Sequence, residues 1–236
     1  MPNQFFQFKK FTVYHDKCAM KVGTDGVLLG AWAMPDNNKP IKILDIGTGT
    51  GLIAMMTAQR FGDAVIDAID IDESACSQAI ENIEKSPFKD RIKVINESFL
   101  DYTTEKQYDL IVSNPPYFRN SLKSPDEKRN KVRHNDSLPL KQMMEHAVRA
   151  LSENGRIALI LPVQSSEELD FIIATHGLHV IRRTEVVSVE GLQPKRFLIE
   201  TATKQGKRAP TDVLVLETKE HKRTAQYQEL TKDFYL

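Results

Sequence analysis

The sequence predicts one α/β domain built around a mostly parallel sheet. Short apolar runs alternate with helical patterns along most of the 236 residues, which is the order expected of stacked strand–helix–strand units. A glycine-rich stretch separates the first of these apolar runs from the helical pattern that follows it. With 41% hydrophobic residues, a chain of this length can bury a full core. We therefore expect a single domain over residues 1–236.

The first half of the sheet is predicted from four apolar runs. Helices are expected after the first two runs, because apolar side chains recur there at helical spacing, as Ala75, Ala79 and Ile83 do. The expected elements are strand 41–46, helix 51–61, strand 64–70, helix 73–85, strand 92–95 and strand Tyr108–Ser113.

The second half adds an antiparallel pair to the parallel sheet. The strands at 180–189 and 196–203 are joined by only a few residues, including Gly191 and Pro194, so they should form a hairpin at the end of the sheet. The remaining expected elements are helix 139–151, strand 156–161, helix 167–175, a strand-like Asp212–Glu217 and a helix-like tail to Leu236.

Composition narrows the possible functions only slightly. Lys and Arg together number 32, as do Asp and Glu, but residues 1–113 carry 12 basic against 16 acidic side chains and residues 114–236 carry 20 against 16. Cys18 and Cys76 show no metal-ligand or disulfide spacing, so we expect no metal. Neither a signal peptide nor a run of membrane-spanning length is evident, and we expect a cytoplasmic protein without membrane contact.

The stretch LDIGTGTG, residues 44–51, lies where a parallel sheet places ligands. Glycines at Gly47, Gly49 and Gly51 permit a sharp turn and let a ligand approach main-chain atoms. The spacing differs from the dinucleotide fingerprint GxGxxG, and no Lys-Ser/Thr pair follows as in a phosphate-binding P-loop. The pattern therefore disfavours phosphate binding, although a purely structural tight turn would also explain a glycine-rich loop alone.

The second predicted strand ends in two acids, Asp70 and Asp72. Asp70 closes the strand beside the glycine-rich loop, where its carboxylate can accept hydrogen bonds from both hydroxyls of a ribose. Asp72 precedes the helical pattern that begins at Glu73 and is expected to cap that helix. The sequence thus combines a glycine-rich loop with an acidic strand end and lacks a phosphate-binding motif. This combination favours S-adenosylmethionine as the ligand.

The fourth strand ends in Asn114-Pro115-Pro116-Tyr117. Asn114 and Pro115 each precede a proline and are therefore held extended. Because neither proline has an N–H, nearby carbonyl groups remain available as acceptors. Together with the Asn114 side chain they can take both hydrogens of a planar amine and orient it toward a methyl donor. Tyr117 offers a face for stacking a flat substrate. The alternative is a rigid turn anchored by packing of Tyr117.

These motifs resemble those of a known family. LDIGTGTGL, the acidic strand end and NPPYF are similar to class I S-adenosylmethionine-dependent methyltransferases that modify exocyclic or amide nitrogens. The run HDKCAMKVGTDGVLLGAW, residues 15–32, and the terminal DFYL resemble the bacterial enzymes that make N6-methyladenine in valine tRNA, just 3′ of the anticodon. The resemblance implies a Rossmann-like fold with seven mostly parallel strands, one strand antiparallel and helices on both faces.

The resemblance also implies roles for individual residues. Residues 1–40 should cover the cofactor and residues 41–236 should form the core with its C-terminal hairpin and tail. One position departs from the family, because Ser98 stands where relatives often place an Asp that accepts from the cofactor's adenine amine. The cofactor-binding residues implied are Lys21, Thr24, Asp25, Asp45, Gly47, Gly49, Gly51, Asp70, Ile71, Ser98 and Phe99, and the catalytic residues are Asn114, Pro115, Pro116 and Tyr117.

Basic residues follow the proline motif and suggest RNA as the macromolecular partner. The expected substrate is a tRNA anticodon stem-loop, in which an adenine can be splayed out without breaking a base pair. We expect a monomer. The residues expected to contact RNA are Phe118, Lys128, Arg129, Lys131, Arg133, Lys195 and Arg196; Lys204, Lys207-Arg208 and Lys222-Arg223 are further basic points.

Three alternatives remain open at this stage. A solvated loop explains each basic cluster on its own. A release-factor glutamine methyltransferase would use the same proline motif, but such enzymes usually carry a separate helical N-terminal domain, and only about forty residues precede the glycine-rich motif here. A non-catalytic protein that binds S-adenosylmethionine or RNA would have no need of paired acceptors beside a methyl donor.

Overall fold

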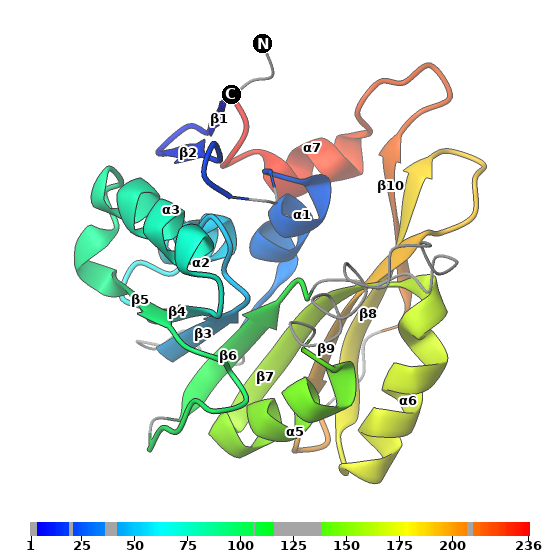
Figure 1. Ribbon diagram of the computed structural model, residues 1–236. Coiled ribbons are helices and arrows are strands. Elements are labelled where there is room, and N and C mark those ends of the chain that lie inside the picture. The colour runs from blue at the N-terminus through cyan, green and yellow to red at the C-terminus, as the bar shows by residue number, and fades with distance from the viewer. Residues whose placement is uncertain (1–3, 19–20, 36–41, 106, 116–137, 207–209) are drawn as a thin grey trace, which may run out of the picture.

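A twisted sheet of eight described strands runs through the molecule (Figure 1). The computed structural model describes residues 4–18, 21–35, 42–105, 107–115, 138–206 and 210–236. The strand order is β10-β8-β9-β7-β6-β3-β4-β5. The strands are β3 (Lys42–Ile46), β4 (Val65–Asp70), β5 (Ile92–Asn96), β6 (Tyr108–Ser113), β7 (Leu151–Pro162), β8 (His179–Val189), β9 (Arg196–Ala202) and β10 (Asp212–Glu217).

Pairing in this sheet is mostly parallel, as predicted. β9 is antiparallel to both of its neighbours, β7 and β8, and every other pair in the sheet is parallel. The predicted hairpin is therefore confirmed, but it does not end the sheet. β10 pairs in parallel with β8, for example Leu214 with Val186, which makes eight strands rather than the seven expected. Residues 212–217 lie far from β8 along the chain, and sequence patterns do not reveal such pairings.

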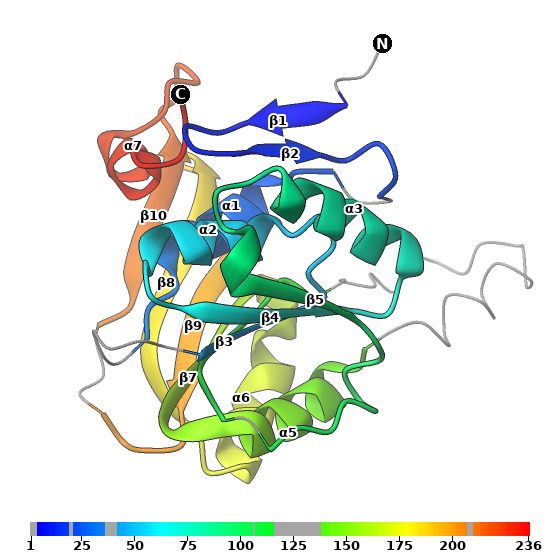
Figure 2. The same ribbon diagram turned by 90° about the vertical axis from the view of Figure 1, so that its left-hand side faces the viewer.

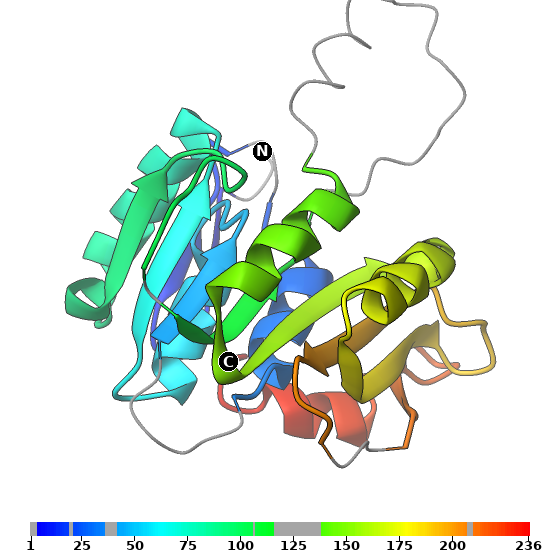
Figure 3. The ribbon, with the colours of Figure 1, turned by 90° about the horizontal axis from the view of Figure 1, so that it is seen from below.

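Helices cover both faces of the sheet, also as predicted (Figure 2, Figure 3). Because side chains alternate along a strand, Ile43 of β3 packs into the apolar cluster beneath α1 and α2, whereas Leu44 packs into the cluster beneath α5 and α6. The helices are α1 (Thr24–Trp32), α2 (Leu52–Arg60), α3 (Glu73–Glu84), α5 (Leu140–Ala150), α6 (Ser166–Thr175) and α7 (Ala225–Thr231), with short 3-10 turns at Lys89–Arg91 and Val163–Ser165.

Strand β7 begins earlier than the sequence predicts. It follows directly on α5 at Leu151, which pairs with Tyr108, and the register shifts before Leu110 pairs with Arg156. Gly155 lies in this irregular stretch, where an added Cβ would come within 2.6 Å of the Tyr108 carbonyl oxygen. The close backbone approach explains why glycine stands here in a strand rather than in a turn.

The N-terminal strands β1 (Phe5–Gln7) and β2 (Thr12–Tyr14), like helix α1, were not predicted from the sequence. A hairpin of β1 and β2 packs beside the C-terminal tail (Figure 2). The Lys9 N–H donates to the Phe234 carbonyl oxygen at 2.8 Å, and the Phe8 and Tyr235 rings stack with centroids 6.0 Å apart. The two ends of the chain thus form one layer over α1 and α2.

Helix α1 is fixed to the sheet by a polar network at its C-terminal end. The Trp32 indole N–H donates to the Thr184 hydroxyl at 3.1 Å, and the Arg182 guanidinium lies 3.6 Å from the centroid of the Trp32 ring. Glu200 is fully buried and accepts hydrogen bonds from Arg182 at 2.9 Å and from the Met34 N–H at 2.7 Å. This network determines where the opposite, N-terminal end of α1 lies.

Candidate active site

The glycine-rich loop connects β3 to α2 at the carboxyl edge of the parallel strands, where sheets of this kind bind ligands. Gly47, Gly49 and Gly51 have φ of 70°, 55° and 80°, in the left-handed region that favours glycine. An added Cβ at Gly47 or Gly49 would have no described atom within 4 Å, whereas at Gly51 it would lie 3.4 Å from Ala79 and Ile83. Gly47 and Gly49 therefore leave open space, and Gly51 allows α3 to pack closely.

Asp45 lies beneath this loop rather than in it. Its carboxylate is fully buried and accepts hydrogen bonds from the Thr48 hydroxyl at 2.6 Å and from the Ala54 N–H at 3.1 Å. Burial raises the pKa of Asp45 to about 7, although both hydrogen bonds oppose that shift. Asp45 thus ties the glycine-rich loop to the first turn of α2.

Asp70 also holds the glycine-rich loop, from the end of β4. One carboxylate oxygen accepts from the Gly49 N–H at 2.8 Å, and the other accepts from the Asp72 N–H at 3.0 Å. The prediction that Asp72 caps the following helix is confirmed, because its side chain accepts hydrogen bonds from the Ser74 and Ala75 N–H groups at the start of α3. Asp70 keeps acceptor sites for further hydroxyl donors, since each carboxylate oxygen has two lone pairs.

Three further residues expected at the cofactor, Ile71, Ser98 and Phe99, do not line the cavity described below. Ile71 is 58% exposed and follows directly on Asp70. Ser98 is half-buried, and its carbonyl oxygen accepts from the Asp101 N–H at 3.0 Å. Phe99 is buried and makes an edge contact with the His146 ring.

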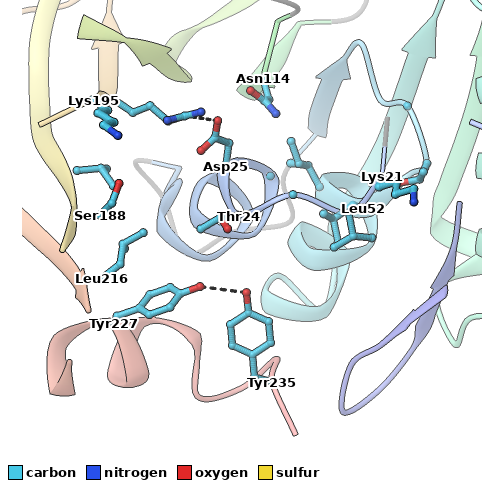
Figure 4. Close-up of a pocket in the computed structure, with 18 of the residues that line it drawn as sticks. Lys21, Thr24, Asp25, Leu52, Asn114, Ser188, Lys195, Leu216, Tyr227 and Tyr235 are labelled. Carbon is cyan, nitrogen blue, oxygen red and sulfur yellow. Dashed lines mark hydrogen bonds and ion pairs between the residues drawn. The ribbon is translucent and has the colours of Figure 1, made fainter. Parts of the chain in front are cut away.

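A cavity of about 670 Å³ brings together residues that lie far apart in the chain (Figure 4). Its volume is within the range of small-molecule sites in proteins. It is lined by Lys21, Thr24 and Asp25 at the start of α1, by Gly47 and Gly49, by Asn114 and Pro115, and by Lys195 and Arg196. Asp45, Gly51, Asp70, Ile71, Ser98 and Phe99 do not line it, so the predicted cofactor residues divide into a group at the cavity and a group beyond the glycine-rich loop.

Asn114 follows the last residue of β6 and is half-buried at the cavity wall. The preceding Ser113 is fully buried, and its hydroxyl donates to the Ile46 carbonyl oxygen at 2.8 Å, which ties the end of β6 to the end of β3. The start of the proline motif is thus fixed beside the glycine-rich loop. The predicted residues Pro116, Tyr117, Phe118, Lys128, Arg129, Lys131 and Arg133 lie outside the described residues.

An ion pair joins two residues to which the sequence assigned different roles. Asp25, expected at the cofactor, binds the Arg196 guanidinium, expected at RNA (Figure 4). The two residues come from α1 and from the first position of β9. Sequence reasoning could not detect this pair, because its members are 171 positions apart.

The cavity also has lining residues to which the sequence gave no role in the site. Ser188 of β8, Leu216 of β10 and Tyr227 of α7 line it together with Arg223 and Tyr235. The only sequence signals in this region were the terminal DFYL and the basic pair Lys222-Arg223. Both signals fall in the element that the sequence treated as a closing tail.

The described residues offer neither a membrane-spanning helix nor a metal-binding cluster. In this part of the chain, no helix has the length and apolarity needed to cross a membrane. Among the same residues, no group of three or more His, Cys, Asp or Glu side chains could hold a metal ion.

Comparison with solved structures relates the fold to methyltransferases. A crystal structure described as a predicted O-methyltransferase from Agrobacterium tumefaciens superposes with a TM-score of 0.69, covering 89% of this chain and 96% of that one at 18% identity. TYW2 from P. horikoshii, solved in complex with MeSAdo, superposes with a TM-score of 0.58 at 14% identity, covering 85% of this chain and 71% of that one. At these identities the likeness establishes the fold.

Comparison of sequences establishes the family. The model of the methyltransferase small domain matches residues 26–176. A tRNA1(Val) (adenine(37)-N6)-methyltransferase from Parabacteroides distasonis is 50% identical, and one from Bacteroides thetaiotaomicron is 46% identical; each alignment covers 100% of this chain and 99% of the relative. The chain therefore belongs to the methyltransferase small domain family and, within it, to the family of the tRNA1(Val) (adenine(37)-N6)-methyltransferases.

Proposed function

We propose that this protein transfers a methyl group from S-adenosylmethionine to N6 of an adenine in tRNA, at position 37 of tRNA1(Val). The observation that carries the proposal is that the open glycine-rich loop and Asn114-Pro115 line one cavity. A methyl donor at the loop and an amine held by Asn114 would then face each other. The full-length identity to enzymes of that name supports the substrate.

The glycine-rich loop fits the cofactor. The space above Gly47 and Gly49, which a Cβ would occupy, admits the methionine end, with Lys21, Thr24 and Asp25 covering it. Asp70 accepts from the ribose hydroxyls while it holds Gly49. Gly51 and Asp45 shape the loop from behind, and Ile71, Ser98 and Phe99 form the adenine side. When bound, S-adenosylmethionine supplies an electrophilic methyl group on a sulfonium.

Asn114 and the carbonyl group of Pro115 act on the acceptor amine. An exocyclic adenine amine is conjugated and weakly nucleophilic, so its orientation toward the methyl donor contributes most of the catalysis. Two acceptors that take its hydrogens favour the tetrahedral geometry that nitrogen adopts as it attacks. No strong base is needed beforehand, because the proton leaves after nitrogen has become cationic. Tyr117 stacks on the base, and Pro116 keeps the segment extended.

The direct test is incubation with labelled S-adenosylmethionine and unmodified tRNA1(Val) transcript, followed by nucleoside analysis. We expect N6-methyladenosine at position 37, and no label in a transcript with guanine at that position. Purified release factor and a mixture of other unmodified tRNAs serve as competing acceptors in parallel reactions. Preferred labelling of a glutamine in the release factor, or no transfer to any RNA, would overturn the proposal.

A further inference from the structure

The cavity extends beyond the space that faces the glycine-rich loop. In Figure 4, Thr24 and Asp25 of α1 lie between Lys21 and Leu52 on one side and Lys195, Ser188, Leu216 and Tyr227 on the other. We call the second side the distal lobe and define it by Ser188, Lys195, Leu216, Arg223, Tyr227 and Tyr235. These residues come from β8, the β8–β9 turn, β10 and the C-terminal tail, none of which contributes to the glycine-rich loop.

Within the part of the chain that the structure describes, two cations of the distal lobe have no acidic partner. Among the described residues, no carboxylate lies within ion-pair distance of Lys195 or Arg223. Arg196, the next residue after Lys195, is by contrast held by Asp25. Lys195 and Arg223 are therefore the cations in this wall that can neutralise an anion without first giving up a partner.

One acidic side chain, that of Glu217, shares this wall with the two cations. Glu217 lines the cavity, but its carboxylate contacts the His221 imidazole at 3.0 Å, on the turn that follows β10. A negatively charged ligand in the distal lobe would thus face two cations that have no carboxylate partner among the described residues, and one carboxylate that contacts an imidazole. The balance of charge favours an anion.

The floor of the distal lobe is aromatic and rigid. The hydroxyl groups of Tyr227 and Tyr235 are hydrogen-bonded at 3.0 Å, and their rings meet edge to face with centroids 6.2 Å apart. The Arg223 guanidinium lies 4.3 Å from the centroid of the Tyr235 ring. Stacking on the ring restricts the guanidinium to few orientations while its N–H groups remain available to a ligand.

We propose, resting on tRNA as the substrate, that the distal lobe binds the nucleotide adjacent to the target adenine. Lys195 and Arg223 would contact its phosphate, and Ser188, Leu216 and Tyr227 its sugar and base. A base held at Asn114 is covalently linked to its neighbours, so we expect the next phosphate group to lie along a wall of the same cavity. The cations of the distal lobe fit the phosphate of such a nucleotide, and its aromatic rings fit the base.

The test combines variants of the protein with an altered RNA backbone. An anticodon stem-loop carrying the target adenine is made with a neutral methylphosphonate at one loop linkage at a time, and its binding is measured over a range of salt concentrations. Arg223→Ala and Lys195→Ala should each weaken binding of unmodified stem-loop about tenfold and lower the salt slope by about 1. Lys219→Ala, an equal loss of charge on the exposed turn after β10 and outside the cavity, should change neither quantity.

One linkage next to the target adenine should be coupled to Arg223. Neutralising that linkage should weaken binding to wild-type protein about tenfold but have little further effect on Arg223→Ala, whereas other linkages should add independently. Additive effects at every linkage, or an unchanged salt slope in both variants, would overturn the distal-lobe proposal. Stem-loop binding without methylation of adenine would overturn the proposed function alone, and absence of stem-loop binding would overturn both.

Discussion

The Asp70 carboxylate accepts a hydrogen bond from the Gly49 N–H at 2.8 Å, which fixes the tip of the glycine-rich loop to the end of β4. The same side chain is proposed to accept from the cofactor ribose, so one residue both shapes the loop and binds the ligand. This double role distinguishes Asp70 from Asp72, whose carboxylate is occupied by the first turn of α3.

Replacing Asp70 by Ala should weaken cofactor binding by roughly 1–3 kcal/mol, the cost of leaving hydrogen-bonding groups without their charged acceptor. Asp70→Asn keeps an oxygen for Gly49 but loses the charge, so its effect should lie between wild type and Asp70→Ala. Isothermal titration with S-adenosylmethionine measures both variants, and circular dichroism checks the fold. An unchanged dissociation constant in Asp70→Ala would remove Asp70 from the site.

Neutralising Lys128, Arg129, Lys131 and Arg133 together should reduce RNA affinity without affecting the cofactor. If all four contact phosphates of a single-stranded loop, the slope of log affinity against log salt should fall by up to about 3. Filter binding of tRNA over a salt series tests this, with cofactor titration as the control. An unchanged slope would mean that these residues form only a solvated surface.

Glu200 should be important for stability rather than for chemistry. Its buried carboxylate is paired with Arg182 and Arg156, so Glu200→Ala would remove the carboxylate that both partly buried guanidinium groups contact. We expect a loss of about 3–5 kcal/mol in the free energy of unfolding. Glu153→Ala, which breaks the exposed pair with Lys204, should cause no measurable loss. Urea unfolding compares the two variants, and equal stabilities would contradict the role of the α1 network.

The stability of the protein should depend on the protonation of Asp45. Burial raises its pKa in the folded state to about 7 from 3.8, so between these values the folded protein holds a proton that the unfolded chain has released. Stability contributed by the protonated form should therefore fall as pH rises from about 4 to about 7. Asp45→Asn should remove that part of the slope. Urea unfolding at a series of pH values measures the free energy of unfolding of both proteins. Parallel curves of this free energy against pH for wild type and Asp45→Asn would contradict the prediction.

Much of the sheet could be predicted because its determinants are local. β3, β4 and β6 are short, mostly apolar runs, and the closely spaced glycines between β3 and α2 are typical of a loop that needs left-handed backbone. The Asp72 cap was likewise predictable from the two residues beside it. Helix α1 was missed because the buried side chains run without interruption from Gly26 to Trp32, which removes the polar face that identifies a surface helix.

The cavity wall opposite the glycine-rich loop could not be predicted in the same way. The pairing of β10 with β8 and the pairing of Asp25 with Arg196 both depend on residues far apart in the chain. Arg223 could be recognised as basic, but only the packing of α7 and Tyr235 places it in the cavity. Local patterns therefore predicted the glycine-rich loop and left the opposite wall of the cavity incomplete.

Tyr117 should contribute to base capture as well as to rate. Tyr117→Ala removes a stacking face worth roughly 1–3 kcal/mol, so binding of the stem-loop and methyl transfer should both decline. Tyr117→Phe keeps the face and should be close to wild type. Direct binding and single-turnover transfer, measured on the same stem-loop, separate the two effects; equal losses in both variants would indicate that the hydroxyl matters and the stacking does not.

The most direct test of the central claim is single-turnover methyl transfer by Asn114→Ala to an anticodon stem-loop carrying the target adenine. Asn114 is proposed to bind the amine most strongly as its geometry changes, so its loss should lower the rate of transfer by about 10²–10³. Binding of the stem-loop and of S-adenosylmethionine, measured in parallel, should change little. An Asn114→Ala protein that methylates the adenine at near the wild-type rate would contradict the mechanism.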